Sequence, residues 1–152
     1  MEFELRPWRD SDGADFFRYG CTPDIIRYMT PGYPRTLADC ARVVAGFARE
    51  DSRKQRSRAV TVLGTAVGSV GAFLQANGTA QLAYWLGTEF QRQGVMTAVL
   101  RQFCAQLWAD YELTALTARP HEDNLPSRRT LERAGFRRMP DGVYRLERPC
   151  AG

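Results

Sequence analysis

The chain has 152 residues, of which 44% are hydrophobic and 25% are charged, and its formal net charge is only +4. These values resemble those of an ordinary globular domain and argue against a disordered chain. The length fits one domain, so we expect residues 1–152 to form a single unit. The small positive excess is no more than a few extra surface arginines would give, so charge alone does not predict a nucleic-acid partner.

The cysteines and the opening residues indicate a reducing, aqueous compartment. Cys21, Cys40, Cys104 and Cys150 form no CxxC pair and match no zinc-ligand spacing, so we expect reduced thiols and no bound metal. The first residues lack the apolar core of a signal peptide, and no stretch is long enough to cross a membrane. We therefore expect a cytoplasmic protein that does not act on membranes.

The first fifty residues predict a strand followed by helices. Phe3 and Leu5 alternate with polar residues, which indicates an opening strand. Helix-starting side chains then recur at 10–12, at 23–24 and at Thr36, each ahead of an apolar pattern with helical spacing.

A basic stretch at 53–58 follows the third helical pattern. It lies between a helix and a strand pattern and has no interleaved aromatic residues. We interpret it as a solvated loop and expect no nucleic-acid binding.

The middle of the chain predicts an antiparallel meander and then a long helix. Alternating patterns at 59–63, 67–74 and 80–86 indicate three strands, with tight turns at 64–65 and 77–78. Gly68 and Gly71 fall inside the second strand and indicate a bend or a close approach of two strands. The period then changes to that of a helix, whose apolar face is formed by Met96, Val99, Leu100, Phe103 and Leu107.

The last forty residues predict a strand, a helix and a hairpin. A strand pattern covers 113–118, and Asn124 is a helix cap with Pro126 in the first turn and Gly135 at the end. Two short strands around 141–142 close the chain. This order of elements predicts an α+β fold, a sheet with helices packed on it.

Chemistry is indicated where the strand at 80–86 leads into the long helix. Gly94 lies at the junction of loop and helix, where the first N–H groups of a helix lack partners and the helix dipole is positive. Without a Cβ at that point, a phosphate can approach the backbone, and Arg92 adds a positive charge. A glycine before a helix is more often only a turn residue, so this pattern alone does not decide the function.

The sequence resembles the GNAT superfamily of N-acetyltransferases, and within it the bacterial ribosomal-protein N-terminal acetyltransferases. Four stretches carry the resemblance, in the right order: 5–12, 81–87, 91–96 and 124–136. The third, Gln-Arg-Gln-Gly-Val-Met, is similar to the acetyl-CoA signature Q/R-x-x-G-x-G/A. The resemblance implies a mixed, mostly antiparallel sheet in which two parallel strands splay apart, with helices on both faces.

The resemblance also implies how acetyl-CoA binds. The pantetheine arm lies in the splay and pairs with main chain near Trp85 and Leu86, while Asn124 contacts the arm and Ser127 lies near the thioester sulfur. Backbone amides of the signature hold the pyrophosphate, and these belong to Gln91, Arg92, Gln93, Gly94, Val95, Met96 and Thr97.

Three positions depart from the family pattern. Met96 replaces the last small residue of the signature, Leu131 stands where many members carry a tyrosine acid, and Gln81 stands where a glutamate is common. No strong general base or acid is therefore carried over from the family.

The expected reaction is attack of a neutral amine on a thioester. A main-chain N–H near Leu86 is the expected oxyanion donor. Ser127 is the candidate proton donor to the thiolate, although its hydroxyl would equally suit a bond within the first helical turn. His121, the only histidine, is the candidate general base, against the alternative of a surface loop residue.

The lack of a strong general base indicates which kind of amine accepts the acetyl group. An α-amine has a pKa of about 7.7–8.0 and a lysine about 10.4, so far more of the α-amine is neutral at pH 7. We therefore expect a protein or peptide N-terminus as acceptor, in a groove that Trp8, Tyr28 and Tyr33 would line if they are not simply packing residues. The alternatives are an acetyltransferase of a small amine (a polyamine, amino acid or antibiotic) and a non-catalytic acyl-CoA sensor. The sequence allows a monomer or a homodimer.

Overall fold

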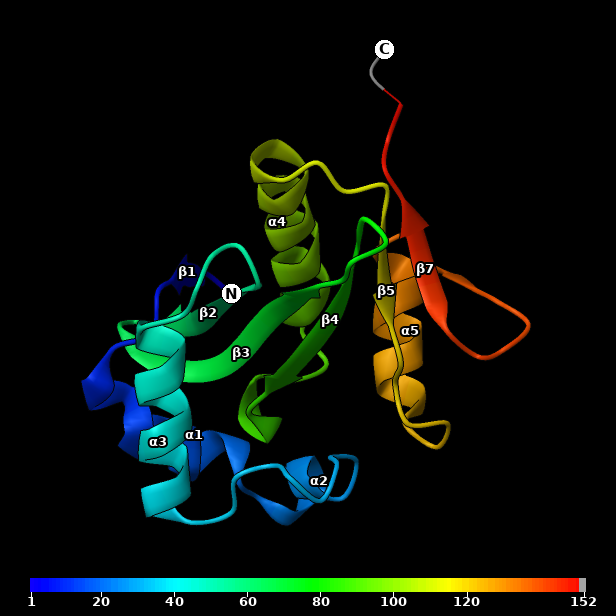
Figure 1. Ribbon diagram of the computed structural model, residues 1–152. Coiled ribbons are helices and arrows are strands. Elements are labelled where there is room, and N and C mark those ends of the chain that lie inside the picture. The colour runs from blue at the N-terminus through cyan, green and yellow to red at the C-terminus, as the bar shows by residue number, and fades with distance from the viewer. Residues whose placement is uncertain (151–152) are drawn as a thin grey trace.

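The computed structural model describes residues 1–150, which form one seven-stranded sheet with helices on both faces (Figure 1). The elements follow the predicted order: β1 (Glu4–Arg6), the 3-10 turn η1 (Asp10–Asp12), α1 (Gly13–Gly20), α2 (Pro23–Ile26), α3 (Leu37–Ala48), β2 (Gln55–Val62), β3 (Thr65–Leu74), β4 (Thr79–Leu86), the 3-10 turn η2 (Thr88–Phe90), α4 (Val95–Asp110), β5 (Ala115–Ala118), α5 (Leu125–Arg133), β6 (Arg137–Arg138) and β7 (Tyr144–Glu147).

The sheet has the strand order β1-β2-β3-β4-β5-β7-β6. Every neighbouring pair is antiparallel except β4 and β5, which are parallel because α4 connects them as a crossover. This arrangement confirms the predicted mixed, mostly antiparallel sheet with one parallel pair.

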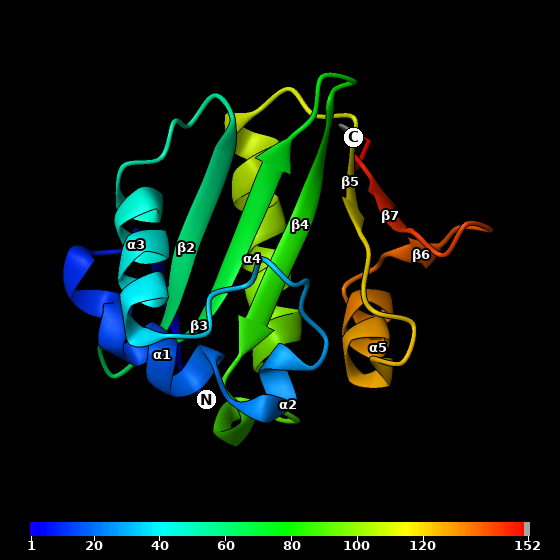
Figure 2. The same ribbon diagram turned by 60° about the horizontal axis from the view of Figure 1, so that its bottom comes forward.

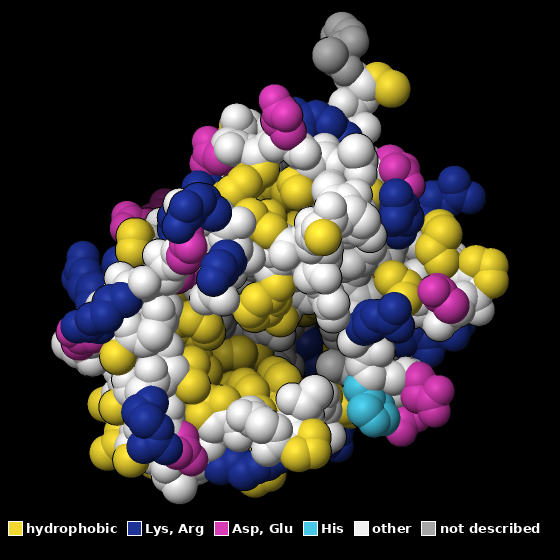
Figure 3. Space-filling view, viewed as in Figure 1, with side chains coloured by type: hydrophobic (Ala, Val, Ile, Leu, Met, Phe, Trp, Pro, Cys, Tyr) yellow, Lys and Arg dark blue, Asp and Glu magenta, His cyan; other side chains and the backbone are white. Residues whose placement is uncertain are grey.

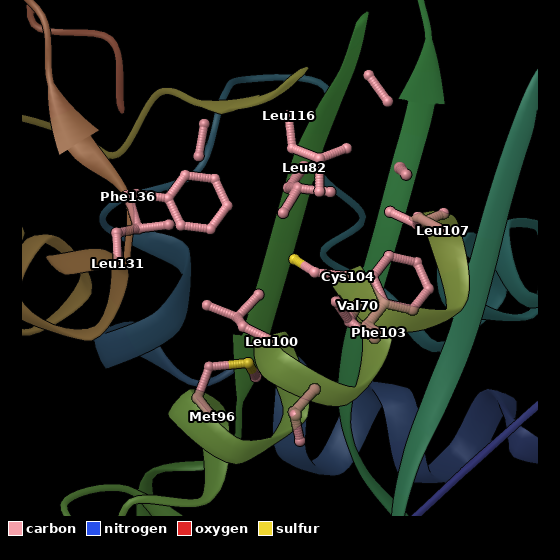
Figure 4. Packing of buried hydrophobic residues seen from close by; sticks show 14 of the residues in the cluster. Val70, Leu82, Met96, Leu100, Phe103, Cys104, Leu107, Leu116, Leu131 and Phe136 are labelled. Atoms are coloured by element: carbon pink, nitrogen blue, oxygen red, sulfur yellow. The ribbon is translucent and has the colours of Figure 1, made fainter. Parts of the chain in front are cut away.

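Two cores lie on opposite faces of the sheet. The views in Figures 1 and 2 place α1 and α3 over one face and α4 and α5 over the other. Side chains of β4 alternate between them: Leu82 and Leu86 belong to the core beneath α4, whereas Trp85 belongs to the core beneath α1 and α3. Figure 4 shows Leu100, Phe103 and Leu107 of α4 in the first of these cores.

The helix caps follow the sequence signals. Thr36 Oγ1 accepts a hydrogen bond from the Asp39 N–H at 3.1 Å, and Asn124 Oδ1 accepts one from the Ser127 N–H at 3.2 Å. Each bond satisfies one of the amides that a helix start leaves without a partner.

At the carboxyl end of α4, the side chain of Arg148 satisfies main-chain carbonyl groups. The guanidinium of Arg148 donates to the main-chain carbonyls of Trp108, Tyr111 and Leu113 at 2.8–3.1 Å. A positive charge at this end of a helix also opposes the helix dipole.

Two local predictions were wrong. The basic stretch is not a loop throughout, because Gln55 already begins β2, and Arg58 there forms an ion pair with Glu50 at 3.0 Å. The hairpin turn after β2 consists of Leu63 and Gly64, not of Gly64 and Thr65. Both Leu63 and Gly64 have positive φ, as a two-residue hairpin turn that matches the strand twist requires.

The four cysteines are free thiols, as predicted. No helix within residues 1–150 has the length and apolar character needed to span a membrane. Nor does this part of the chain gather three or more metal-ligating side chains in one place.

Candidate functional site

The two parallel strands separate at their carboxyl ends. Their pairing runs from Thr79 opposite Ala115 to Leu82 opposite Ala118, and β4 then continues to Leu86 without β5 beside it. The residue after Arg119 is Pro120, which has no N–H for the ladder and disfavours a regular continuation. We call the space between the diverging ends of β4 and β5 the strand gap; it confirms the predicted splay.

The register of β3 and β4 decides which main-chain groups face the strand gap. The Gly87 N–H donates to the Val67 carbonyl at 2.7 Å, which marks this pair as one that exchanges hydrogen bonds. Such pairs alternate along an antiparallel ladder, so Trp85 bonds to β3 while Tyr84 and Leu86 turn their N–H and C=O groups the other way. The geometry thus favours Leu86 over Trp85 as the residue that offers main chain to the strand gap.

The Leu86 carbonyl already has a partner, whereas its N–H remains available. Gln91 Nε2 donates to the Leu86 carbonyl at 2.8 Å, which ties the loop before α4 to the end of β4. Gly68 of β3 lies directly opposite Leu86. A Cβ on Gly68 would come within 2.9 Å of both Leu86 Cδ1 and the Trp85 carbonyl oxygen, which confirms the close approach predicted there.

Residues 91–97 form the second part of the site, which we call the amide cradle. Gly94 caps α4 with φ of 75°, and Arg92 has φ of 63°, so the chain turns through the left-handed region twice before the helix. Among the described residues no acceptor is found for the N–H groups from Arg92 to Thr97, and the first bond into the helix is donated by Ala98. Successive free amides in such a turn form a concave site for an anion.

The amide cradle is open to a ligand. A Cβ built on Gly94 would have no heavy atom within 4 Å. Arg92 is exposed and forms no ion pair among the described residues, while Val95 and Met96 bury their side chains beneath α4. The cradle therefore exposes backbone and one positive charge while its apolar side chains anchor it to the core.

The start of α5 forms the far side of the strand gap. Asn124 and Ser127, the two residues predicted there, are joined by the capping bond. Leu131, which replaces the tyrosine of many family members, is fully buried in the core.

Sequence reasoning missed Tyr84. Its hydroxyl lies 2.7 Å from Ser127 Oγ and 3.3 Å from the Ser127 carbonyl oxygen, so one side chain of β4 reaches α5. Burial raises the pKa of Tyr84, an effect that outweighs the opposing influence of the Ser127 hydrogen bond. A signal was present, because Tyr84 alternates with Leu82 and Leu86 on an apolar face, where a phenol hydroxyl requires a partner.

His121 lies at the edge of the site with its side chain about half exposed. Its Nδ1 accepts a hydrogen bond from the Asp123 N–H at 3.2 Å, and its ring lies 5.7 Å from that of Tyr28. A neutral ring that accepts at Nδ1 carries its proton on Nε2, so it has no second lone pair to offer a substrate. This arrangement favours the loop interpretation of His121 over the general base.

Of the three aromatic residues predicted to line the acceptor groove, only one lies against the loop before α5. Trp8 is buried against Phe16 and Phe47, so it is a packing residue. Tyr33 donates from its hydroxyl to the Gly20 carbonyl at 2.7 Å. Tyr28 alone contacts the loop that leads to α5, through His121.

The surface is hollowed between β4 and the α5 side (Figure 3). Two further cavities have more basic than acidic side chains in their walls. One, of about 290 Å³, is lined by three arginines (Arg119, Arg128, Arg138) and two acids (Glu122, Asp141). The other, of about 360 Å³, is lined by Arg35 and Arg42 with Asp39. Neither cavity has the acidic lining that a polycationic ligand would favour.

Known proteins share this sequence pattern and fold. Residues 2–137 match the family described as acetyltransferase (GNAT) domain. A protein of Bacillus subtilis (strain 168), provisionally named as the ribosomal N-acetyltransferase YdaF, is 32% identical over 73 residues. That match covers 46% of this chain and spans only 40% of the length of YdaF.

Two solved structures have the same fold over almost their full length. RimL, a ribosomal L7/L12 alpha-N-protein acetyltransferase in complex with coenzyme A, has a TM-score of 0.81 at 17% identity, covering 95% of this chain and 93% of RimL. The aminoglycoside acetyltransferase AAC(6')-Ib, in complex with coenzyme A and kanamycin, has a TM-score of 0.78 at 20% identity, covering 97% and 95%. Identities this low establish the shared fold alone.

Proposed function

Because the chain belongs to the GNAT acetyltransferase family, we propose that it transfers the acetyl group of acetyl-CoA to the N-terminal α-amine of a protein or peptide. The observation that carries this proposal is the coincidence of two features at one end of the sheet. There β4 loses its parallel partner, and the free amides of the amide cradle begin within a few residues.

Acetyl-CoA fits these features as follows. The pyrophosphate binds the amides of residues 91–97 with Arg92 beside it, and Gly94 leaves it room. The pantetheine arm enters the strand gap along the carboxyl end of β4 and meets the side-chain amide of Asn124. This direction brings the thioester toward Ser127.

The chemistry needs few protein groups. The amine attacks the thioester carbonyl carbon, and the Leu86 N–H, which faces the strand gap, donates to the oxygen as it becomes negative. Ser127 Oγ donates to the departing sulfur. A thiol with a pKa of about 8.5 leaves readily, so a weak donor suffices.

The α-amine acceptor is supported by what surrounds the site. His121 has its Nδ1 engaged, so we propose no strong base, and an amine that is already partly neutral suits such a site. The two cavities described above each have more arginines than acids in their walls, which opposes polycations such as aminoglycosides. A small-amine acceptor remains the second candidate because AAC(6')-Ib shares the fold.

The proposal is tested by titrating acetyl-CoA calorimetrically and then following thiol release with a panel of amines. The central pair is one peptide with a free N-terminus and no lysine, and the same peptide acetylated at its N-terminus with one lysine added. At pH 7 we expect the first to react at least about 100-fold faster, from the difference in neutral amine. A preference for lysine or kanamycin would refute the α-amine acceptor, and binding without turnover would identify an acyl-CoA sensor.

A further inference from the structure

The side chain of Tyr84 joins β4 to α5 across the strand gap. It lies two residues beyond Leu82, the last β4 residue paired with β5. Its hydroxyl is 2.7 Å from Ser127 Oγ, the usual distance for a hydrogen bond between two hydroxyl groups. Because the bond crosses the strand gap, it lies beside the position that the thioester takes in the proposed function.

We propose that Tyr84 is a positioning residue for acetyl transfer. Its single hydroxyl proton is donated to Ser127 Oγ at 2.7 Å rather than to the Ser127 carbonyl at 3.3 Å, and so directs the Ser127 proton toward the leaving sulfur. This inference rests on the proposed function. A serine hydroxyl has one proton on a freely rotating bond and two acceptor sites. Without Tyr84 it would be free to turn to a main-chain carbonyl at the start of α5, the kind of local partner that serine side chains take near a helix start. Donation from Tyr84 occupies one acceptor site and favours the rotamer in which the proton faces the strand gap.

The environment of Tyr84 suits a permanent donor. Burial raises the pKa of its phenol, so the group keeps its proton throughout the neutral range. In the reaction the carbon–nitrogen bond forms and the carbon–sulfur bond breaks, with the electron pair going to sulfur. The proton lost by the amine nitrogen ends on that sulfur, directly or through water. Tyr84 and Ser127 lose no proton overall; they stabilise the thiolate while it forms.

Tyr84→Phe removes the hydroxyl and keeps the ring. The matched control is Tyr144→Phe, because Tyr144 is also buried and also bonds to α5, through Arg128 and Glu132, but lies on β7. General acid groups typically contribute about 100-fold or more, and a thiolate needs less help, so we expect Tyr84→Phe to lower kcat about tenfold. The dissociation constant of acetyl-CoA should stay within about twofold, and Tyr144→Phe should leave kcat unchanged.

A second acyl donor separates positioning from mere packing. In the oxyester analogue of acetyl-CoA an oxygen replaces the sulfur, and the leaving alkoxide is a far stronger base that depends more on a proton donor. We expect Tyr84→Phe and Ser127→Ala each to lose about 100-fold on this analogue, and the double variant to lose no more than the worse single one.

The outcomes that overturn the inference are distinct from those that overturn the function. Wild-type kcat in Tyr84→Phe, or an equal loss on both donors, refutes the role of Tyr84 while acetyl transfer stands. If Tyr84→Phe fails to fold, an equal loss on both donors in Ser127→Ala refutes it instead. A wild-type chain that binds acetyl-CoA but acetylates no amine refutes the proposed function, and the role of Tyr84 with it.

Discussion

The two neighbours of β4 accompany it over different lengths. On one side, β3 pairs with it from Leu74 opposite Ala80 to Gly68 opposite Leu86. On the other side, β5 stops at Ala118, opposite Leu82. A hairpin keeps β3 and β4 in register from their shared turn, whereas β5 returns through the crossover helix α4 and ends before a proline. The site therefore arises where one strand has lost one of its two partners.

The largest test of this contrast is Gly94→Leu. A side chain at a position with φ of 75° is strained and fills the open space above the amide cradle. We expect acetyl-CoA affinity to fall at least about 100-fold, equivalent to about 2.7 kcal/mol, in a calorimetric titration. The matched control is Gly64→Leu, which has φ of 83° and equal open space but lies in the turn between β2 and β3. It should lose similar stability and keep its affinity; equal affinity in both variants would contradict the amide cradle.

The fully paired side of β4 is tested by Gly68→Ala. The added Cβ would meet the Trp85 carbonyl, which the ladder holds in place, and Leu86 beside the strand gap. We expect a loss of about 1–3 kcal/mol in the free energy of unfolding, measured with urea, and a reduced kcat.

The control for this steric effect is Gly46→Ala in α3. A Cβ at Gly46 meets nothing within 4 Å and replaces a flexible residue in a helix, so we expect a gain of about 0.5–1 kcal/mol. If Gly68→Ala were as stable as the wild type, the close approach of β3 to Leu86 would be disproved.

The smallest expected effect is measured in the unmodified protein, by amide hydrogen exchange followed with NMR. The Trp85 N–H lies within the ladder with β3, while the Leu86 N–H faces the strand gap. In the free protein we expect Leu86 to exchange at least about tenfold faster than Trp85. Saturation with acetyl-CoA should slow Leu86 and leave Trp85 nearly unchanged. Equal protection of both amides without ligand would mean that the register has been misassigned.

Most of the fold, but only part of the site, could be predicted from the sequence. Alternating and helical periods located the strands and helices, and Gly94 and Asn124 marked two helix starts, because such signals are local. The direction of each β4 amide is not local, since it depends on which pairs of the β3–β4 ladder exchange hydrogen bonds. For the same reason the sequence left Trp85 and Leu86 undistinguished.

The bond between Tyr84 and Ser127 could not be predicted for a related reason. The two residues are 43 positions apart and meet only because α5 packs on the same face of the sheet as α4. His121 illustrates the opposite case. The sequence predicted its position in a loop beside the site. The hydrogen bond from the Asp123 N–H to its Nδ1 argues against the role of general base.

Arg148 has a practical consequence for anyone who shortens or tags this chain. Its guanidinium donates to three carbonyls at and just beyond the carboxyl end of α4, the helix whose opposite end is capped by Gly94. A deletion that stops at Glu147 would remove these three hydrogen bonds, although Arg148 itself lies in no helix or strand. An affinity tag fused after Gly152 leaves Arg148 and its three hydrogen bonds in place.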